Sequence, residues 1–151
     1  MDNIIKFLPI VSIFLTGAYF PVGKPLIRPV FQPPNWVFGT VWTYIALTLG
    51  YVTYNILNEK IKYNVRKNIL ILYFTILLML NGWLVLNYYN LYSESFWLLV
   101  ISCFTSIVYV VYLKSLNNSS NLVWLLLPLP FWLVLASCLN GVTYDYSTRK
   151  I

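Results

Sequence analysis

The feature that most constrains this chain is a series of five apolar runs within 151 residues. The runs cover residues 4–22, 36–57, 69–88, 96–113 and 122–143. About 20 mostly apolar residues in an α-helix cross the roughly 30 Å hydrocarbon core of a membrane. A backbone inside lipid must satisfy its own hydrogen bonds, and helices do so within one segment. The sequence therefore predicts an all-α integral membrane protein, a bundle of five transmembrane helices.

The segments between the runs are short and have the composition of loops. Residues 24–35 hold four prolines, which end helices, and residues 58–68 carry five charged side chains. Short connections make consecutive helices antiparallel neighbours, so we expect one transmembrane domain over residues 1–151. The first run could also be a secretory signal peptide. Asp2 weakens a positive amino-terminal region, however, and no cleavage site follows Phe20.

Composition supports a membrane protein and excludes several chemistries. Hydrophobic residues make up 60% of the chain and charged residues 9%, whereas a soluble domain carries about 25% charged residues. The net charge is +6, but the basic residues are scattered and form no stripe for nucleic-acid phosphates. There is no His, and Cys103 and Cys138 stand apart, so neither a metal centre nor His-based acid–base catalysis is expected. We expect no nucleic-acid partner and no required cofactor.

Polar groups inside the runs are few. The runs at 36–57, 69–88 and 122–143 contain no Asp, Glu, Lys or Arg in their interiors, which argues against an ion-coupled transporter or channel. Asn81, Asn87 and Asn140 lie at membrane depth, where an amide either bonds to a neighbouring helix or contacts a ligand. Six Lys and Arg residues flank the runs on the amino-terminal side and four on the other, a small excess that favours a cytoplasmic amino terminus.

Aromatic residues take the place of charge and make up 19% of the chain, with six tryptophans. Trp36 and Trp97 stand near the starts of two runs, as interfacial anchors do. Trp42, Trp83 and Trp132 lie deeper. An indole at such a position either packs between helices or forms the wall of a pocket for a large flat apolar ligand.

Several motifs along the chain form a recognisable set. Residues 28–42 read Arg-Pro, three residues, Pro-Pro, and then an aromatic-rich stretch ending in Val-Trp. Later come Gly50-Tyr51 with Tyr54, Leu80-Asn81 with Tyr88-Tyr89, and Pro128, Trp132, Ala136 and Leu139-Asn140. Together these motifs resemble the signature of the TspO/MBR family, the translocator or tryptophan-rich sensory proteins. Arg28 stands where the family usually has Lys, and Trp83 lies one position before the family's third-span tryptophan.

The resemblance implies a five-helix bundle, commonly a homodimer, with a ligand pocket between the helices under the first loop. Family ligands are porphyrins such as protoporphyrin IX and, in eukaryotic members, cholesterol. The absence of His favours a metal-free porphyrin over haem. Animal members reside in the mitochondrial outer membrane, so that membrane or another intracellular or bacterial membrane is expected. The expected ligand-binding residues are Arg28, Pro33, Pro34, Trp36, Phe38, Trp42, Asn81, Trp83, Trp132, Ala136, Leu139 and Asn140.

Three functions follow from the resemblance and the composition. The first is a membrane-embedded binding protein or receptor for tetrapyrroles and also for sterols. The second is an enzyme for light- and oxygen-dependent porphyrin degradation, as reported for some bacterial members, with Trp42 and Trp132 at the positions of the catalytic tryptophans. The third is a small lipid or metabolite transporter, which the absence of charge inside the runs makes the least favoured.

Two shorter patterns remain. Val142, Tyr144 and Arg149 fit the loose Leu/Val, Tyr, Lys/Arg pattern proposed for cholesterol contact, so we expect them as sterol-contact residues. The same residues also fit a helix end with an interfacial Tyr and a snorkelling Arg. Gly17 and Gly50 could each let two helices approach closely, within the bundle or between the subunits of a dimer.

Overall fold

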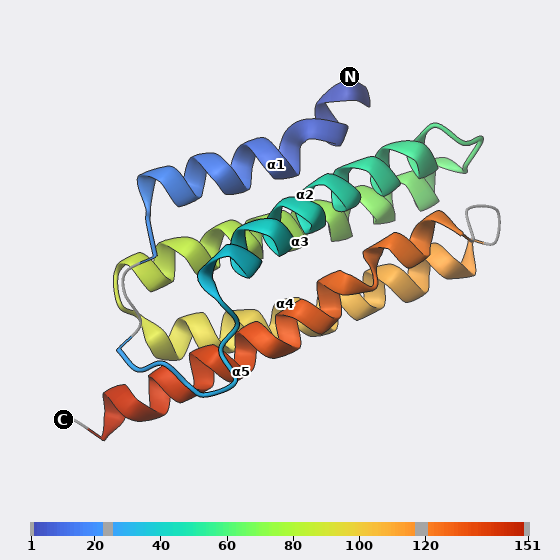
Figure 1. The fold of residues 1–151 in the computed structure, drawn as a ribbon. Helices are drawn as coiled ribbons and strands as arrows, with labels where there is room; N and C mark the ends of the chain where they lie inside the picture. The colour runs from blue at the N-terminus through green and yellow to red at the C-terminus, as the bar shows by residue number, and fades with distance from the viewer. Residues whose placement is uncertain (1, 23–25, 117–120, 150–151) are drawn as a thin grey trace.

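A computed structural model describes residues 2–22, 26–116 and 121–149, and these residues form a bundle of five α-helices (Figure 1). The helices are α1 (Asp2–Tyr19), α2 (Asn35–Leu57), α3 (Tyr63–Tyr88), α4 (Tyr92–Ser115) and α5 (Pro128–Thr148). A short 3₁₀ helix, η1 (Leu122–Leu126), precedes α5. The described residues include no strand. The predicted all-α, five-helix membrane bundle is confirmed.

The helix boundaries differ from the apolar runs where proline or charge decides them. α1 ends at Tyr19, short of Pro21, because a proline ends the helix before it. α3 begins at Tyr63, six residues before its apolar run, so the helix extends through basic residues beyond the apolar segment. The last run is not one helix. Pro128 and Pro130 lack the amide hydrogens that a continuous helix would need, so η1 ends and α5 begins there.

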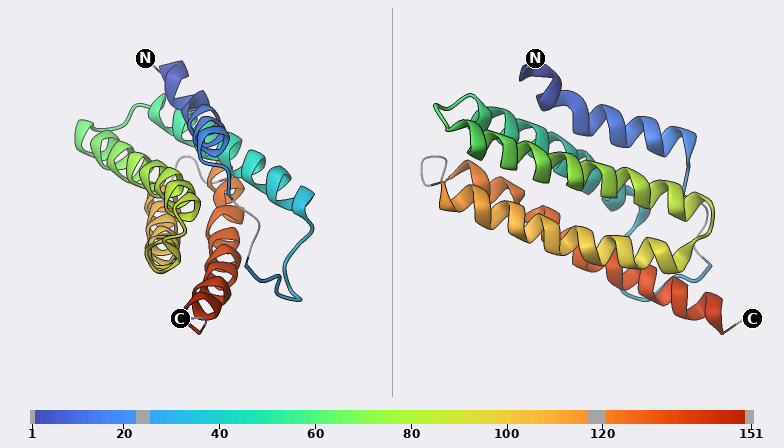
Figure 2. Two further views of the ribbon diagram at one scale, coloured as in Figure 1. Left: turned by 90° about the vertical axis from the view of Figure 1, so that its left-hand side faces the viewer. Right: turned by 180° about the vertical axis from the view of Figure 1, so that it is seen from behind.

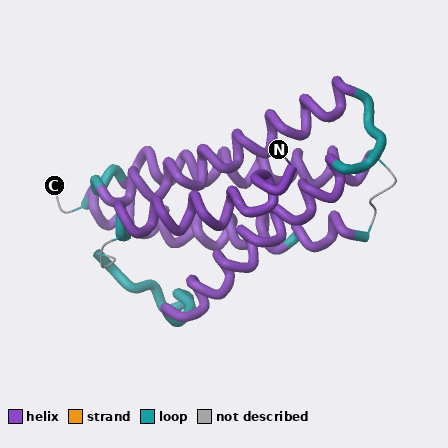
Figure 3. Tube along the Cα trace, turned by 90° about the horizontal axis from the view of Figure 1, so that it is seen from above, coloured by secondary structure: helices purple, strands orange, loops and turns teal. Residues whose placement is uncertain are grey.

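Three helical segments are long and apolar enough, by length and composition, to cross a membrane: α3, α4 and the η1–α5 segment Leu122–Thr148. α1 is also apolar but shorter. α2 has 23 residues and is not among these three segments. α1 and α2 run lengthwise in the same bundle as the other helices (Figure 1). The described loop segments lie mainly toward the ends of the bundle (Figure 3).

The helices form a closed circuit with one loosely packed step. α1 packs on α2 and α3, α3 packs on α4, and α4 packs on α5, while α2 meets α5 over only a short stretch. The end-on view in Figure 2 shows α1 beside α2 at one side of the bundle and α5 on the opposite side. η1 fills part of the space between α2 and α4. Where α2 and α5 do meet, Phe38 of α2 contacts Trp132 of α5.

Two backbone carbonyl groups near Pro9 help to attach the first half of α1 to the bundle. Because Pro9 has no amide hydrogen, the carbonyl of Ile5 loses its helical partner, and the Tyr73 hydroxyl of α3 donates a hydrogen bond to it at 2.7 Å. One residue further on, the Lys6 carbonyl lies so close to Gly50 of α2 that a Cβ atom there would collide with it. Gly50 therefore permits a close helix approach, as expected. Gly17 does not serve that purpose within the bundle, because nothing lies within 4 Å of the position its Cβ would take; its role in a dimer stays a prediction.

The two halves of α2 are packed differently. Every buried residue of this helix lies between Ile45 and Leu57, where Thr53 shares a 2.7 Å hydrogen bond with the Tyr109 hydroxyl of α4. The first ten residues, Asn35–Tyr44, include no buried side chain. The carboxyl-terminal half of α2 thus belongs to the core. Its amino-terminal half, which follows the proline-rich loop, is left only partly covered.

A different turn joins α3 to α4. Asn90 has a positive φ of 59°, a backbone conformation that Asn tolerates better than most residues. The amide of Leu91 donates to the Leu86 carbonyl at 2.9 Å, and the amide of Asn90 donates to the Asn87 carbonyl at 3.0 Å. This is a Schellman motif, which satisfies the last carbonyl groups of α3. It fixes the turn that brings Ser95 of α4 back to the interior.

Candidate functional site

Four aromatic side chains from three helices meet inside the bundle, and we call them the aromatic cluster: Phe38, Trp42, Trp83 and Trp132. The rings of Trp42 and Trp83 are stacked, with centroids 5.6 Å apart and planes inclined by 24°. Phe38 meets Trp132 edge to face at 5.3 Å. Since Phe38 and Trp42 are one helical turn apart on α2, the two pairs are neighbours. The cluster lies on the partly covered half of α2.

An amide network fixes one side of this cluster. The Asn140 side-chain oxygen of α5 accepts hydrogen bonds from the Trp83 indole at 3.3 Å and from the Ser95 hydroxyl at 2.8 Å. The Asn87 side-chain amide donates to Ser95 at 2.6 Å. Asn140 also donates to the Ala136 carbonyl at 3.1 Å. The network links α3, α4 and α5, and it orients the Trp83 ring that stacks on Trp42.

The inner face of α5 follows the spacing read from the sequence. The residues on this face are spaced by four and are buried: the exposed fractions of Trp132, Ala136 and Asn140 are 8%, 5% and 9%. The Trp132 indole nitrogen is buried without a hydrogen-bond partner, the one such side-chain atom among the described residues. An unpaired buried donor carries a desolvation cost. It is therefore a natural partner for an acceptor atom on a ligand.

A groove of about 370 Å³ opens onto the stacked tryptophan pair from the α1 side. Its lining residues come from α1, α2 and α3: Ile13, Phe14, Gly17, Ala18, Gly39, Trp42, Leu80, Trp83 and Leu84. Neither Gly17 nor Gly39 has an atom within 4 Å of where its Cβ would be. The absent side chains thus leave open space in front of the indoles. No charged residue is among the lining side chains.

The remaining expected ligand residues lie outside this cluster. Arg28 is exposed on the loop, and Pro34 caps α2 while Pro33 precedes it, half-buried. Trp36 is 73% exposed at the start of α2, in keeping with its alternative interpretation as an interfacial anchor. Leu139 is half-buried on α5, next to Asn140.

Asn81 was expected as a ligand contact, but the structure places it at the joint between α3 and α1. The Thr16 hydroxyl donates to its side-chain oxygen at 2.6 Å, and its side-chain nitrogen donates to the Leu77 carbonyl at 2.7 Å. The amide also lies 3.4 Å from the Ser12 hydroxyl. These partners occupy the amide, so Asn81 matches the interhelical alternative that the sequence left open.

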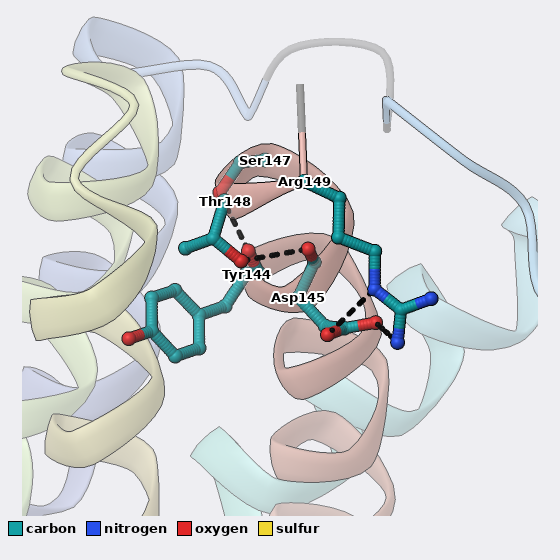
Figure 4. Close-up of polar contacts among 5 residues, drawn as sticks. All are labelled: Tyr144, Asp145, Ser147, Thr148 and Arg149. Atoms are coloured by element: carbon teal, nitrogen blue, oxygen red, sulfur yellow. Dashed lines mark hydrogen bonds and ion pairs between the residues drawn. The ribbon is translucent and has the colours of Figure 1, made fainter. Parts of the chain in front are cut away.

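The three residues of the sterol-contact pattern do not converge on one surface. Tyr144 stacks on Phe96 of α4, with ring centroids 6.3 Å apart. Arg149 extends the other way and forms an ion pair with Asp145 at 3.0 Å (Figure 4). Val142 is half-buried two residues before Tyr144, which turns it by about 200° around the helix. The structure thus shows a helix end with a packed Tyr and an exposed, ion-paired Arg, and sterol contact at these residues stays a prediction.

Sequence reasoning missed most of the groove and part of the amide network. Ile13, Phe14, Ala18, Gly39, Leu80 and Leu84 line the groove, and Ser95 joins the network. The small residues were the available signal, because Gly17-Ala18 and Gly39 interrupt runs of large apolar side chains. Ser95 stands just before the fourth apolar run and had no distinguishing pattern.

The fold and the interior together define a class of protein: an all-helical membrane bundle whose interior site is made of indoles and amides and lacks charged groups. The TspO/MBR family model matches residues 5–144. The tryptophan-rich protein TspO of Chlorobaculum tepidum is 30% identical over 116 residues, which are 76% of this chain and 72% of that protein. The chain belongs to the TspO/MBR family. Membership supports, in general terms, a membrane protein that binds tetrapyrroles or sterols.

Proposed function

We propose that the protein is a membrane-embedded binding protein for tetrapyrroles, with protoporphyrin IX held against the aromatic cluster. The observation that carries this proposal is the presence of two contacting aromatic pairs from α2, α3 and α5, beside an open groove whose lining residues include no charged side chain. Indole faces stack on flat aromatic systems. The groove volume of about 370 Å³ lies within the range of roughly 300–1,000 Å³ for small-molecule sites.

The individual side chains have distinct roles in this proposal. Trp42 lines the groove and offers an indole to the macrocycle, while Trp83 behind it is held in place by Asn140. The unpaired indole N–H of Trp132 would donate to a ligand acceptor once the contact between Phe38 and Trp132 opens. The loop before α2 carries Arg28, whose guanidinium would meet a propionate at the membrane surface.

Fluorescence quenching tests the proposal. Titrating the purified protein in detergent with protoporphyrin IX is expected to quench tryptophan emission to saturation. Trp42→Phe should weaken binding several-fold, because it removes the larger ring from the groove. The matched control is Trp97→Phe, since Trp97 is exposed on α4 away from the cluster. Unsaturable quenching, or equal affinities of the two variants, would contradict binding at the cluster.

A second candidate function, light-driven degradation of the bound porphyrin, is favoured by the stacked pair of Trp42 and Trp83, two oxidisable indoles in contact. In that reaction the macrocycle is oxidised, dioxygen is the oxidant consumed, and light supplies the energy. To test this function, the complex and a protein-free control are illuminated with and without oxygen. The loss of porphyrin absorption is followed by spectroscopy. New product bands should need protein, light and oxygen, and should be lost in a variant with both Trp42 and Trp132 replaced by Phe. Products formed at an unchanged rate by that variant would reject the chemical role of these tryptophans.

Sterol binding, the homodimer and the choice of membrane stay predictions. A sterol would occupy the same apolar groove, and competition between cholesterol and protoporphyrin IX in the fluorescence assay distinguishes a shared site from separate ones. The mass of the protein in detergent, measured by light scattering, tests the homodimer.

A further inference from the structure

A second groove, separate from the aromatic cluster, runs along the outside of the bundle between the end of α4 and the start of α5. Its volume is about 590 Å³. The lining is apolar except for one lysine and one serine at one end: Ile107, Val110, Val111, Lys114, Ser115, Trp124, Leu127, Pro130, Phe131 and Val134. Val111 and Phe131, on opposite sides of the groove, are 62% and 72% exposed. In a membrane bundle, such a surface faces lipid.

The structure around α5 explains why the groove exists. η1 is a tighter helix than α5, and the change from one to the other falls at Pro128 and Pro130. The Pro130 carbonyl lies 3.7 Å from the Cys103 sulfur of α4, so the two helices meet there. Beyond that point, towards η1, the side chains facing outward stand apart and leave the groove between them.

One end of the groove has the chemistry of a membrane interface. The Lys114 ammonium lies over the Trp124 ring, 4.8 Å from its centroid. Lys114 is in the last turn of α4, and Trp124 is half-exposed on η1. Tryptophan beside a basic residue at a helix end is typical of the headgroup level. From Lys114 to Ile107 the groove follows seven residues of α4, or roughly 10 Å, into the hydrocarbon region.

Other charges at this end favour an anionic occupant. α2 ends and α3 begins at the end of the bundle where α4 ends (Figure 1). The basic residues there are Lys60, Lys62, Arg66 and Lys67, and Glu59 is the acidic residue of that connection. Basic clusters at a membrane surface attract anionic lipids, and basic pockets between transmembrane helices bind their headgroups. A zwitterionic lipid also carries a phosphate, but its own cation offsets that charge, so it gains less from Lys114 and the neighbouring basic residues than an anionic lipid does.

We propose that this groove binds an anionic phospholipid, with the phosphate at Lys114 and one acyl chain along the groove between Val111 and Phe131. The site is independent of the tetrapyrrole site, because no residue lines both grooves. An acyl chain fills an apolar channel of this kind without leaving any polar group unpaired. Lys114 would hold the headgroup through charge, and Trp124 would pack beside the glycerol region.

Native mass spectrometry of the full chain, released from mixed phosphatidylglycerol and phosphatidylcholine bilayers, tests the proposal. The expected spectrum shows one retained phosphatidylglycerol in preference to phosphatidylcholine. Lys114→Gln should lower that preference roughly five-fold, the effect of one basic residue near the membrane surface. The control, Lys67→Gln, removes the same charge at the same end of the bundle from an exposed residue outside the groove. Because Lys67 lies outside the groove and attracts anionic lipid only from a distance, this control should lower the preference less than Lys114→Gln does.

A third variant separates the groove from the charge. Val111→Trp fills the groove and keeps Lys114, and the site is exposed enough to accept a larger side chain. It should release the bound lipid without lowering thermal stability in detergent. Equal losses in Lys114→Gln and Lys67→Gln would overturn the proposal in favour of general charge attraction. Lipid retention by Val111→Trp, or a dimer that this variant dissociates without any bound lipid, would also overturn it.

Discussion

The Asn140 side chain contributes both to the packing of the helices and to the geometry of the site. The substitution Asn140→Leu tests both contributions. The substitution keeps the branched shape of the side chain but removes the oxygen that accepts from Trp83 at 3.3 Å and from Ser95 at 2.8 Å. Interhelical hydrogen bonds in membranes contribute about 0.6 kcal/mol each on average and at most about 1.7 kcal/mol. Two lost bonds therefore predict a loss of roughly 1–3 kcal/mol in the free energy of unfolding.

The matched control is Asn55→Leu. The Asn55 amide donates only to the Tyr51 carbonyl of its own helix, at 2.7 Å. The same chemical change there removes no contact between helices, and it should alter stability by less than about 0.5 kcal/mol. Unfolding in detergent, followed by circular dichroism as denaturant is added, measures both variants. Equal stability of the two variants would refute the view that Asn140 joins α3, α4 and α5.

A double-mutant cycle isolates the bond to the indole. Trp83→Phe removes the indole N–H, so the cost of Asn140→Leu should be smaller in that background than in the natural chain. The difference should be about 0.6 kcal/mol, the mean value for such a bond. Additive costs would show that the 3.3 Å contact contributes no coupling energy. Because Trp83 stacks on Trp42, Asn140→Leu should also weaken porphyrin binding, whereas Asn55→Leu should leave it unchanged.

Three further substitutions test other parts of the structure. Gly50→Ala should lower the free energy of unfolding by about 1–3 kcal/mol, because the added methyl group meets the Lys6 carbonyl. Gly17→Ala should leave stability unchanged or raise it by up to about 1 kcal/mol. If thermal unfolding in detergent ranks the two variants the other way, the packing of α1 on α2 is contradicted. Arg28→Ala should weaken protoporphyrin IX about two- to five-fold more than its uncharged dimethyl ester, as for an exposed ion pair, and equal losses in fluorescence titrations would exclude charge pairing. Ala136→Leu should lower stability by about 1–3 kcal/mol, because Ala136 is 5% exposed and does not line the groove. A stable Ala136→Leu variant that no longer binds porphyrin would instead place this residue in a ligand cavity.

Local sequence rules predicted much of the fold. Apolar length gave the five helices, and spacing by four residues gave the inner face of α5, because both depend only on helix geometry. The same rules did not predict η1. Pro128 and Pro130 indicated a break in the helix. The apolar run continues across them, however, so a prediction from hydropathy alone treats η1 and α5 as one helix.

The candidate site was less predictable because its contacts join residues far apart in the chain. Trp83 and Asn140 are 57 residues apart, and no local pattern indicates that their side chains meet. The deep tryptophans were recognised as either packing or pocket residues, and the structure shows that Trp42 and Trp83 do both, because they stack on each other and line a groove. The sequence predicted the same two possible roles for Asn81 and Asn140, a hydrogen bond between helices or a ligand contact. The position of α1 separates them, since it supplies the Thr16 hydroxyl that bonds to Asn81.

The first and second halves of α2 lie in parts of the bundle that differ in how tightly their side chains are packed. At the end where α1 begins, Tyr73 holds the Ile5 carbonyl, Gly50 admits the Lys6 carbonyl, and Tyr109 joins Thr53. Each of these contacts needs a particular side chain or its absence, so this half has little freedom to rearrange. In the other half, residues Asn35–Tyr44 of α2 have no buried side chain. Asn140 ties α5 to α3 and α4 in this half, so motions that admit a ligand should be confined to residues 26–34 and the first turns of α2. Hydrogen exchange should show faster amide exchange in Asn35–Tyr44 than in Ile45–Leu57, with protoporphyrin IX slowing only the former; uniform protection along α2 would contradict this division.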